Sequence, residues 1–139
     1  MTPESLATLH ARAFSAQRPW SAQEFSDLLG SPLVFLVSQP HAFALGRAIA
    51  GEAELLTLAT DPDHRRHGLG RQALQSYELA AEKRGAHRSF LEVAADNAAA
   101  ISLYQSAGYT VDGRRPDYYL TPGGAKVDAV LMSRNLPQG

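Results

Sequence analysis

Residues 61–70 read Asp-Pro-Asp-His-Arg-Arg-His-Gly-Leu-Gly and separate an apolar run over residues 54–60 from an amphipathic stretch over residues 69–84. The run predicts a strand and the stretch predicts a helix, so this segment joins the end of a strand to the start of a helix. Free N–H groups and the positive end of the dipole at a helix start favour an anion, and Gly68 and Gly70 let the backbone approach it closely. The segment therefore predicts a turn that binds phosphate.

Arginines add positive charge to this turn, because Arg65, Arg66 and Arg71 can pair with phosphate oxygens. The turn is not a Walker loop, since Gly70 is followed by Arg71 and Gln72 rather than by Lys and Ser or Thr. It also lacks the Gly-x-Gly-x-x-Gly spacing of dinucleotide-binding proteins. Taken alone, the segment is equally well interpreted as a solvated turn whose glycines start a helix.

Apolar periodicity predicts two helices before this segment, a second helix after it, and several strands. The further helices are expected over residues 2–14, 21–30 and 97–107, and the further strands over residues 33–37, 41–48, 89–94, 109–111 and 127–132. Ser21 and Glu24 have the spacing of a capping box, and Gly51, Gly85 and Gly108 predict a turn and two helix ends. This order predicts one mixed α/β or α+β domain over residues 1–139, built around one sheet.

The composition is that of an ordinary globular protein, with 45% apolar and 19% charged residues in a chain of 139. A net charge of -1 argues against a nucleic-acid partner held by overall charge. The chain has no cysteine, and its five histidines are scattered without carboxylates at metal-ligand spacing, so we expect no metal. We see no signal peptide and no membrane-spanning run, and so expect a cytoplasmic protein without a membrane partner.

Polar side chains in the second half of the chain predict a catalytic site. Glu92 interrupts the apolar strand, where a carboxylate needs a partner or a cleft and could serve as a general base. Asn97, Ala100 and Tyr104 follow on one stripe of the next helix, over roughly 10 Å of its axis, along which a long thin ligand could lie. The alternatives are an edge-strand Glu92 facing water, an Asn97 that only caps the helix, and a Tyr104 that only packs the core.

These motifs together resemble the GNAT acetyltransferases. The shared motifs are Arg65-x-x-Gly68-x-Gly70 after a strand and Asn97-x-x-Ala100-x-x-Leu103-Tyr104-x-x-x-Gly108-Tyr109. Further segments resemble the RimI-type enzymes that acetylate N-terminal alanine, namely Leu91-Glu92-Val93, Arg114-Arg115-x-x-Tyr118-Tyr119 and Asp128-Ala129-Val130-Leu131-Met132. The resemblance covers about residues 54 to 133 well, and the N-terminal third in outline through Pro19-Trp20-Ser21.

The resemblance implies a mixed, mainly antiparallel sheet flanked by helices, with acetyl-CoA as co-substrate and an amine as acceptor. The residues that it implies for binding the cofactor are Leu58, Ala59 and Thr60 for the acetyl-pantetheine arm, Arg65, Arg66, His67, Gly68, Leu69, Gly70 and Arg71 for the pyrophosphate, and Asn97 and Ala100 for the CoA arm. It implies Glu92 as general base and Tyr104 as general acid. Trp20, Tyr118 and Tyr119 are expected to bind the acceptor.

Three functions remain open from the sequence. The resemblance favours acetylation of a protein N-terminus, as in a ribosomal protein, with a small-molecule amine as the second acceptor class. A catalytically silent acyl-CoA-binding module is the third, although such a module would need neither Glu92 nor Tyr104. Glu52 and Glu54 are rival bases on the strand before the phosphate turn. The acceptor groove is expected between the Trp20 region and a loop over residues 114–121.

Overall fold

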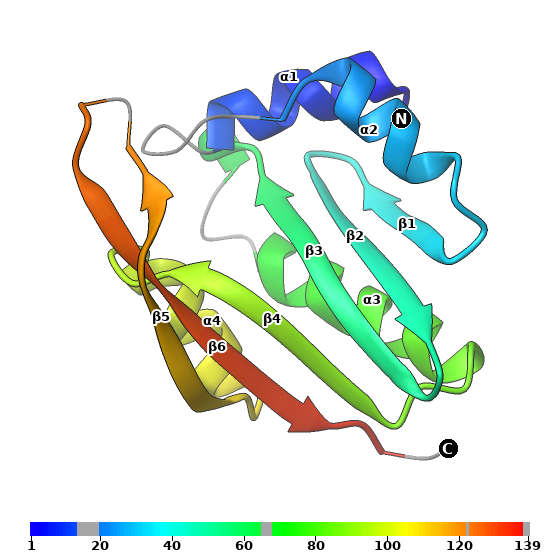
Figure 1. The fold of residues 1–139 in the computed structure, drawn as a ribbon. Coiled ribbons are helices and arrows are strands. Elements are labelled where there is room, and N and C mark those ends of the chain that lie inside the picture. Colours follow the sequence, from blue (N-terminus) through cyan, green and yellow to red (C-terminus); the bar gives the residue numbers. More distant parts are fainter. Residues whose placement is uncertain (14–19, 65–67, 122, 138–139) are drawn as a thin grey trace.

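The computed structural model describes residues 1–13, 20–64, 68–121 and 123–137 as a six-stranded sheet flanked by helices (Figure 1). The elements in chain order are α1 (Pro3–Ala13), α2 (Ala22–Leu29), β1 (Val34–Gln39), β2 (Ala42–Ile49), β3 (Glu52–Thr60), the short 3-10 helix η1 (Pro62–His64), α3 (Leu69–Lys83), β4 (Arg88–Ala94), α4 (Ala98–Ser106), β5 (Thr110–Leu120) and β6 (Lys126–Asn135). Within the described parts of the chain, no helix combines the length and apolar character needed to cross a bilayer.

The strands lie in the order β1-β2-β3-β4-β6-β5. β3 and β4 run parallel, whereas the other neighbouring pairs run antiparallel. The expected mixed, mainly antiparallel sheet is therefore confirmed. Because a parallel connection needs a crossover, α3 carries the chain over one face of the sheet between β3 and β4.

Each face of the sheet has its own apolar core. The core beneath α1 and α2 consists of Leu6, Leu9, Phe25, Phe43, Leu45 and Ala59. The larger core lies beneath α3 and α4, on the opposite face in Figure 1. There Gly46 permits close packing, since a Cβ at this position would lie 2.6 Å from ring atoms of Phe35 and Tyr77. The buried helix faces thus follow the predicted 3.6-residue periodicity.

Local signals place most element ends where the sequence predicts them. The Ser21 side chain accepts a hydrogen bond from the Glu24 backbone and the Glu24 side chain accepts one from the Ser21 backbone, so the capping box is confirmed. Gly51 turns the chain between β2 and β3 with φ +84°. Gly85 and Gly108 follow the two later helices with φ +85° and +99°, a conformation that favours glycine.

The main error concerns β5, for which the sequence predicted a strand over residues 109–111 and a loop over residues 114–121. The structure instead has one long strand, which pairs with β6 from Thr110 to Leu120 across two irregularities. Asp117 sits within it at φ +54°, and its backbone N–H donates to Asp128. Tertiary pairing with β6 overrides the low strand propensity of the charged and proline-containing segment.

The site is created where β3 and β4 separate. Their parallel pairing runs only from Glu52 to Leu55 on β3, although β3 continues to Thr60. On the β2 side, Leu45 pairs with Thr57 and Gly46 with Leu55, so Leu56 is an extra residue, a β-bulge. A bulge bends its strand and increases the local twist. β3 therefore diverges from β4 beyond the bulge, as Figure 1 shows, and the sheet opens between them.

Candidate active site

A pocket of about 650 Å³ occupies the opening between β3 and β4. Its walls are the ends of these two strands, the start of α3, one side of α4, and residues near the end of α1. The described residues implied for the cofactor all line it: Leu58, Ala59, Thr60, Gly68, Leu69, Gly70, Arg71, Asn97 and Ala100. Arg65, Arg66 and His67 lie outside the described residues. The fold thus gathers in one pocket motifs that lie far apart in the sequence.

One end of the pocket is the N-terminus of α3. Gly68 is the N-cap with φ +72° and has no side chain to cap the first amides, and the first turn of α3 contains no acidic residue. Gly70 lines the pocket, and a Cβ added at this position would lie 3.3 Å from the flexible end of the Leu103 side chain. Free amides at a helix start, next to a surface without side chains, suit a phosphate group.

The floor of the pocket is the outer part of β3. Between Thr57 and Thr60 this strand is paired with β2 on one edge, while its other edge faces the pocket because β4 has diverged. Backbone donors and acceptors on such an edge can pair with an extended, amide-containing ligand, as an added strand would. The edge therefore suits the implied role of Leu58, Ala59 and Thr60 towards an acetyl-pantetheine arm.

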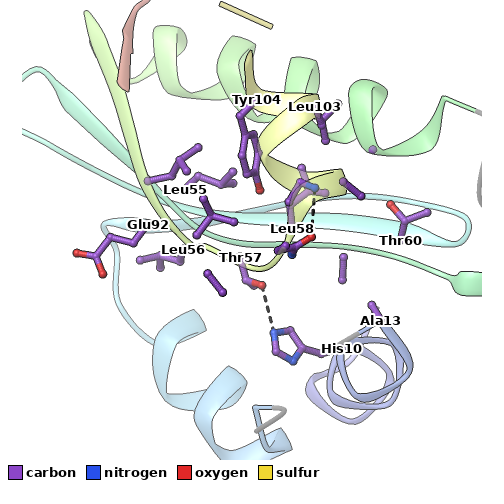
Figure 2. Close-up of a pocket in the computed structure, with 18 of the residues that line it drawn as sticks. His10, Ala13, Leu55, Leu56, Thr57, Leu58, Thr60, Glu92, Leu103 and Tyr104 are labelled. Atoms are coloured by element: carbon purple, nitrogen blue, oxygen red, sulfur yellow. Dashed lines mark hydrogen bonds between the residues drawn. The ribbon is translucent and has the colours of Figure 1, made fainter. Parts of the chain in front are cut away.

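The helix α4 forms the opposite wall. The Asn97 side chain caps it by accepting a hydrogen bond of 3.2 Å from the Ala100 backbone, and both residues line the pocket. Tyr104 is 7% exposed, and Figure 2 shows its hydroxyl directed into the pocket. Burial raises the pKa of Tyr104 well above its usual value, so its hydroxyl remains protonated at neutral pH. Asn97 thus caps the helix and Tyr104 packs in the core, and both residues also line the pocket.

Glu92 lies at the edge of the same pocket, on β4. Its side chain is 23% exposed and is turned outward in Figure 2. Glu92 Oε1 lies 3.1 Å from Arg115 Nε. The rival bases lie elsewhere. Glu52 pairs with Arg88 at 3.0 Å and Glu54 pairs with Arg47 at 2.6 Å, and neither lines the pocket.

Two of the three residues predicted to bind the acceptor line the pocket, and the third does not. Trp20 and Tyr119 line the pocket, whereas Tyr118 is 52% exposed and outside its lining. Arg115 lies over the Tyr118 ring, 5.5 Å from its centroid. Burial, and next the charge of Glu92, raise the pKa of Tyr119 to about 12. Tyr119 thus lies within electrostatic range of Glu92.

His10 and Thr57 belong to the pocket but were not found from the sequence. His10 Nε2 lies 3.1 Å from Thr57 Oγ1, as Figure 2 shows, and His10 Nδ1 accepts a hydrogen bond from the Trp20 backbone. The rings of His10 and Trp20 stack with centroids 5.2 Å apart. His10 therefore ties α1, β3 and Trp20 together. Its position four residues after the buried Leu6 was the signal that could have marked it as inward-facing.

The expectation that no histidines gather with a carboxylate is wrong. His41, Asp61 and His64 place one ligand atom each within 4.8 Å of one another. The cause is the antiparallel pairing of β2 and β3, in which Ala42 faces Thr60, so the residues just outside this pair meet. Sequence spacing alone does not show such a contact.

Comparisons with known proteins identify the family of this chain. Residues 4–109 match the acetyltransferase (GNAT) family. The [ribosomal protein bS18]-alanine N-acetyltransferase of Escherichia coli K12 is 38% identical over 136 residues, which cover 95% of this chain and 91% of that protein. The N-alpha-acetyltransferase RimI of Mycobacterium tuberculosis is 35% identical over 138 residues, which cover 93% and 84%.

Structural similarity extends over almost the whole chain. The crystal structure of the ribosomal-protein-S18-alanine N-acetyltransferase from Escherichia coli matches with a TM-score of 0.86 and 34% identity, covering 99% of this chain and 89% of that one. The sequence similarity and the structural similarity thus indicate the same family. This chain belongs to the GNAT family and is a RimI-like, acetyl-CoA-dependent N-acetyltransferase.

Proposed function

We propose that this enzyme transfers the acetyl group of acetyl-CoA to the α-amine at a protein N-terminus, with the N-terminal alanine of ribosomal protein bS18 as its acceptor. The observation that carries the proposal is a single pocket that joins a helix N-terminus, an unpaired strand edge, Tyr104 and Glu92. The acceptor follows from similarity over 95% of the chain to an enzyme named for that reaction.

Acetyl-CoA fits the pocket in one direction. The pyrophosphate lies at the α3 N-terminus beside Gly68 and Gly70, where free amides and the helix dipole stabilise its charge. The pantetheine arm runs along the open edge of β3 between Leu58 and Thr60, with Asn97 on the α4 side. This direction brings the thioester to the part of the pocket that contains Tyr104 and Glu92.

The residues around the thioester have complementary tasks. Glu92 accepts a proton from the acceptor ammonium, directly or through water, so that the free amine can attack the thioester carbonyl. Backbone N–H groups on the open edge of β3, near Ala59, stabilise the negative charge that develops on the carbonyl oxygen. Tyr104 donates its proton to the sulfur as the carbon–sulfur bond breaks. The second proton of the attacking nitrogen passes, directly or through water, to the Tyr104 oxygen as the amide forms, and Glu92 releases its proton to solvent. Protons and charges then balance without a covalent intermediate on the enzyme.

An α-amine suits this site better than a lysine side chain. The α-amino group has a pKa near 7.7–8.0 and lysine near 10.4, so deprotonating lysine at the same pH costs roughly 3 kcal/mol more. One partly exposed carboxylate such as Glu92 suits the easier deprotonation. Trp20 and Tyr119 line the pocket and can pack against the first residues of a peptide.

A CoA-release assay tests the acceptor class. A peptide with the first residues of ribosomal protein bS18 and a free N-terminal alanine is compared with a polyamine, an aminoglycoside and free alanine. We expect kcat/KM for the peptide to exceed that for each small amine by about 100-fold, which corresponds to about 2.7 kcal/mol. A small amine that reacts as fast as the peptide would contradict the proposal.

Two neighbouring tyrosines provide a matched control for the same assay. Tyr119→Ala should raise KM for the peptide because Tyr119 lines the pocket, whereas Tyr118→Ala should change it less because Tyr118 lies outside the lining. Equal effects of the two changes would remove Tyr119 from the acceptor site.

A further inference from the structure

A second cluster of ligand-type side chains lies just beyond the paired ends of β2 and β3. His41 precedes β2, Asp61 follows β3, and His64 ends η1. The Asp61 backbone N–H donates to the His41 carbonyl at 2.8 Å, which fixes the two segments side by side. None of these three residues lines the acetyl-CoA pocket. The cluster is therefore separate from the active site.

We propose that His41, Asp61 and His64 form a binding site for one divalent transition metal ion of the zinc type. Two imidazoles and one carboxylate are the donor set that Zn²⁺ accepts in proteins, with a water molecule as the fourth ligand. Because this chain has no cysteine, its transition-metal ligands must come from such groups.

The distances between the donor atoms fit a metal of this size. His41 Nδ1 lies 3.8 Å from Asp61 Oδ2, and His64 Nδ1 lies 3.6 Å from the same oxygen. In a tetrahedral site with bonds of about 2.1 Å, neighbouring ligand atoms lie roughly 3.4 Å apart. The two imidazole–carboxylate distances therefore exceed the tetrahedral value by only a few tenths of an ångström.

His64 provides an independent observation. Its Nδ1 is buried, and among the described residues it has no hydrogen-bond partner, an arrangement that normally costs free energy. A metal ion bound to this nitrogen would satisfy it. The rings of His41 and His64 stack at 3.5 Å between centroids with 7° between their planes, so they must tilt for both lone pairs to converge. His41 has room to tilt, since its side chain is 46% exposed.

The carboxylate is held as metal-ligating carboxylates are held in known sites. Asp61 Oδ1 accepts a hydrogen bond from the Asp63 backbone N–H at 3.0 Å, and Arg12 donates to Asp61 Oδ2 at 3.1 Å. Such outer contacts orient the ligand and fix its position. The two negative charges of Asp61 and Asp63 exceed the single positive charge of Arg12, so these three groups present a net negative charge to a cation.

Calorimetric titration of the untagged, metal-free enzyme with ZnCl₂ tests the site. We expect one Zn²⁺ per chain, with binding weakened at least tenfold in both His41→Gln and His64→Gln. His87→Gln is the matched control, because His87 is an exposed histidine that does not belong to the His41–Asp61–His64 cluster. It should bind Zn²⁺ as the wild type does. Zn²⁺ should also raise the Tm of the wild type and of His87→Gln, but not of the two ligand variants.

Three results would overturn the proposal. They are a wild type with no saturable Zn²⁺ binding, a His64→Gln or His41→Gln variant that binds as tightly as the wild type, and a His87→Gln variant that loses binding to the same extent. Circular dichroism and Tm without metal show that each variant is folded. Because the two ligand variants change different segments, a folding defect in one leaves the other as the test.

Discussion

Arg115 Nε on β5 lies 3.1 Å from Glu92 Oε1 on β4, although β6 separates the two strands. The contact depends on β5 continuing as a strand through Arg115, where it pairs with Ala129 of β6. Arg115 thereby holds the outward orientation of the proposed base at the mouth of the pocket. The strand that the sequence predicted poorly is thus the one that positions the carboxylate.

Removing this contact should affect catalysis more than stability. The pair is partly exposed, with 55% of the Arg115 side chain accessible, and exposed pairs contribute about 0.2–1 kcal/mol. Arg115→Gln should therefore lower kcat by at most about fivefold, with little change in acetyl-CoA affinity or Tm. Arg114→Gln is the control, because Arg114 pairs with Asp128 instead. A variant at position 115 that is faster than the wild type would show that the pair restrains Glu92 rather than positioning it.

Glu92→Gln should separate chemistry from cofactor binding. The amide keeps the size of the side chain but cannot accept the ammonium proton, a function that contributes about 10²- to 10⁴-fold in rate. We expect kcat to fall within that range, while acetyl-CoA affinity measured by calorimetry stays near the wild-type value. Glu54→Gln is the matched control, since Glu54 pairs with Arg47 away from the pocket. Loss of turnover in the control, with normal turnover in Glu92→Gln, would transfer the base role to Glu54.

Tyr104→Phe should remove the proton donor and keep the wall of the pocket. Burial raises the pKa of Tyr104, so the hydroxyl keeps its proton up to and beyond about pH 10, the usual tyrosine value. The kcat of the variant should therefore fall at least about tenfold. The factor should be similar across the neutral and mildly alkaline pH range. Tyr109→Phe is the control, because the Tyr109 hydroxyl forms hydrogen bonds with Glu78 and Ser89 in the core. Tyr109→Phe should lower Tm without lowering kcat. An unchanged kcat in Tyr104→Phe would show that Tyr104 is not the general acid.

Gly70→Asp should weaken acetyl-CoA binding through charge. The carboxylate would lie at the start of α3, where the pyrophosphate is expected, and repel it. Calorimetry should show at least a tenfold loss of affinity, about 1.4 kcal/mol. Gly70→Asn has nearly the same size without the charge, and the clash of its Cβ is limited to the flexible end of Leu103 at 3.3 Å. If both variants lose affinity equally, size rather than charge explains the effect, and the phosphate assignment fails.

The helices and the inner strands could be predicted from sequence because local signals determine them. The capping box at Ser21 and the glycines at 85 and 108 set element ends that the structure confirms. The outer strand β5 could not be predicted, because Pro116 and its charged neighbours form a strand only through pairing with β6. Local propensity carries no information about that partner.

The residues of the candidate site also fall into those that local motifs predict and those that depend on tertiary contacts. Glu92, Tyr104, Asn97 and the glycines were predicted as pocket residues from motifs, and the described ones line a single pocket. His10 and Thr57 were missed because they meet across α1 and β3, 47 positions apart in the chain. The bulge at Leu56 was equally hidden, since only the pairing register of β2 and β3 reveals an extra residue. Motifs identify residues, but the sheet determines which residues meet.

The position of the acetyl group on a peptide tests the central claim most directly. The peptide carries a free N-terminal alanine and one internal lysine, and its product with the enzyme and acetyl-CoA is fragmented in a mass spectrometer. We predict a single acetyl group, on the α-nitrogen of alanine, and no reaction of the same peptide when its N-terminus is blocked. Acetylation of the lysine at a comparable rate, in either the free or the blocked peptide, would contradict the account.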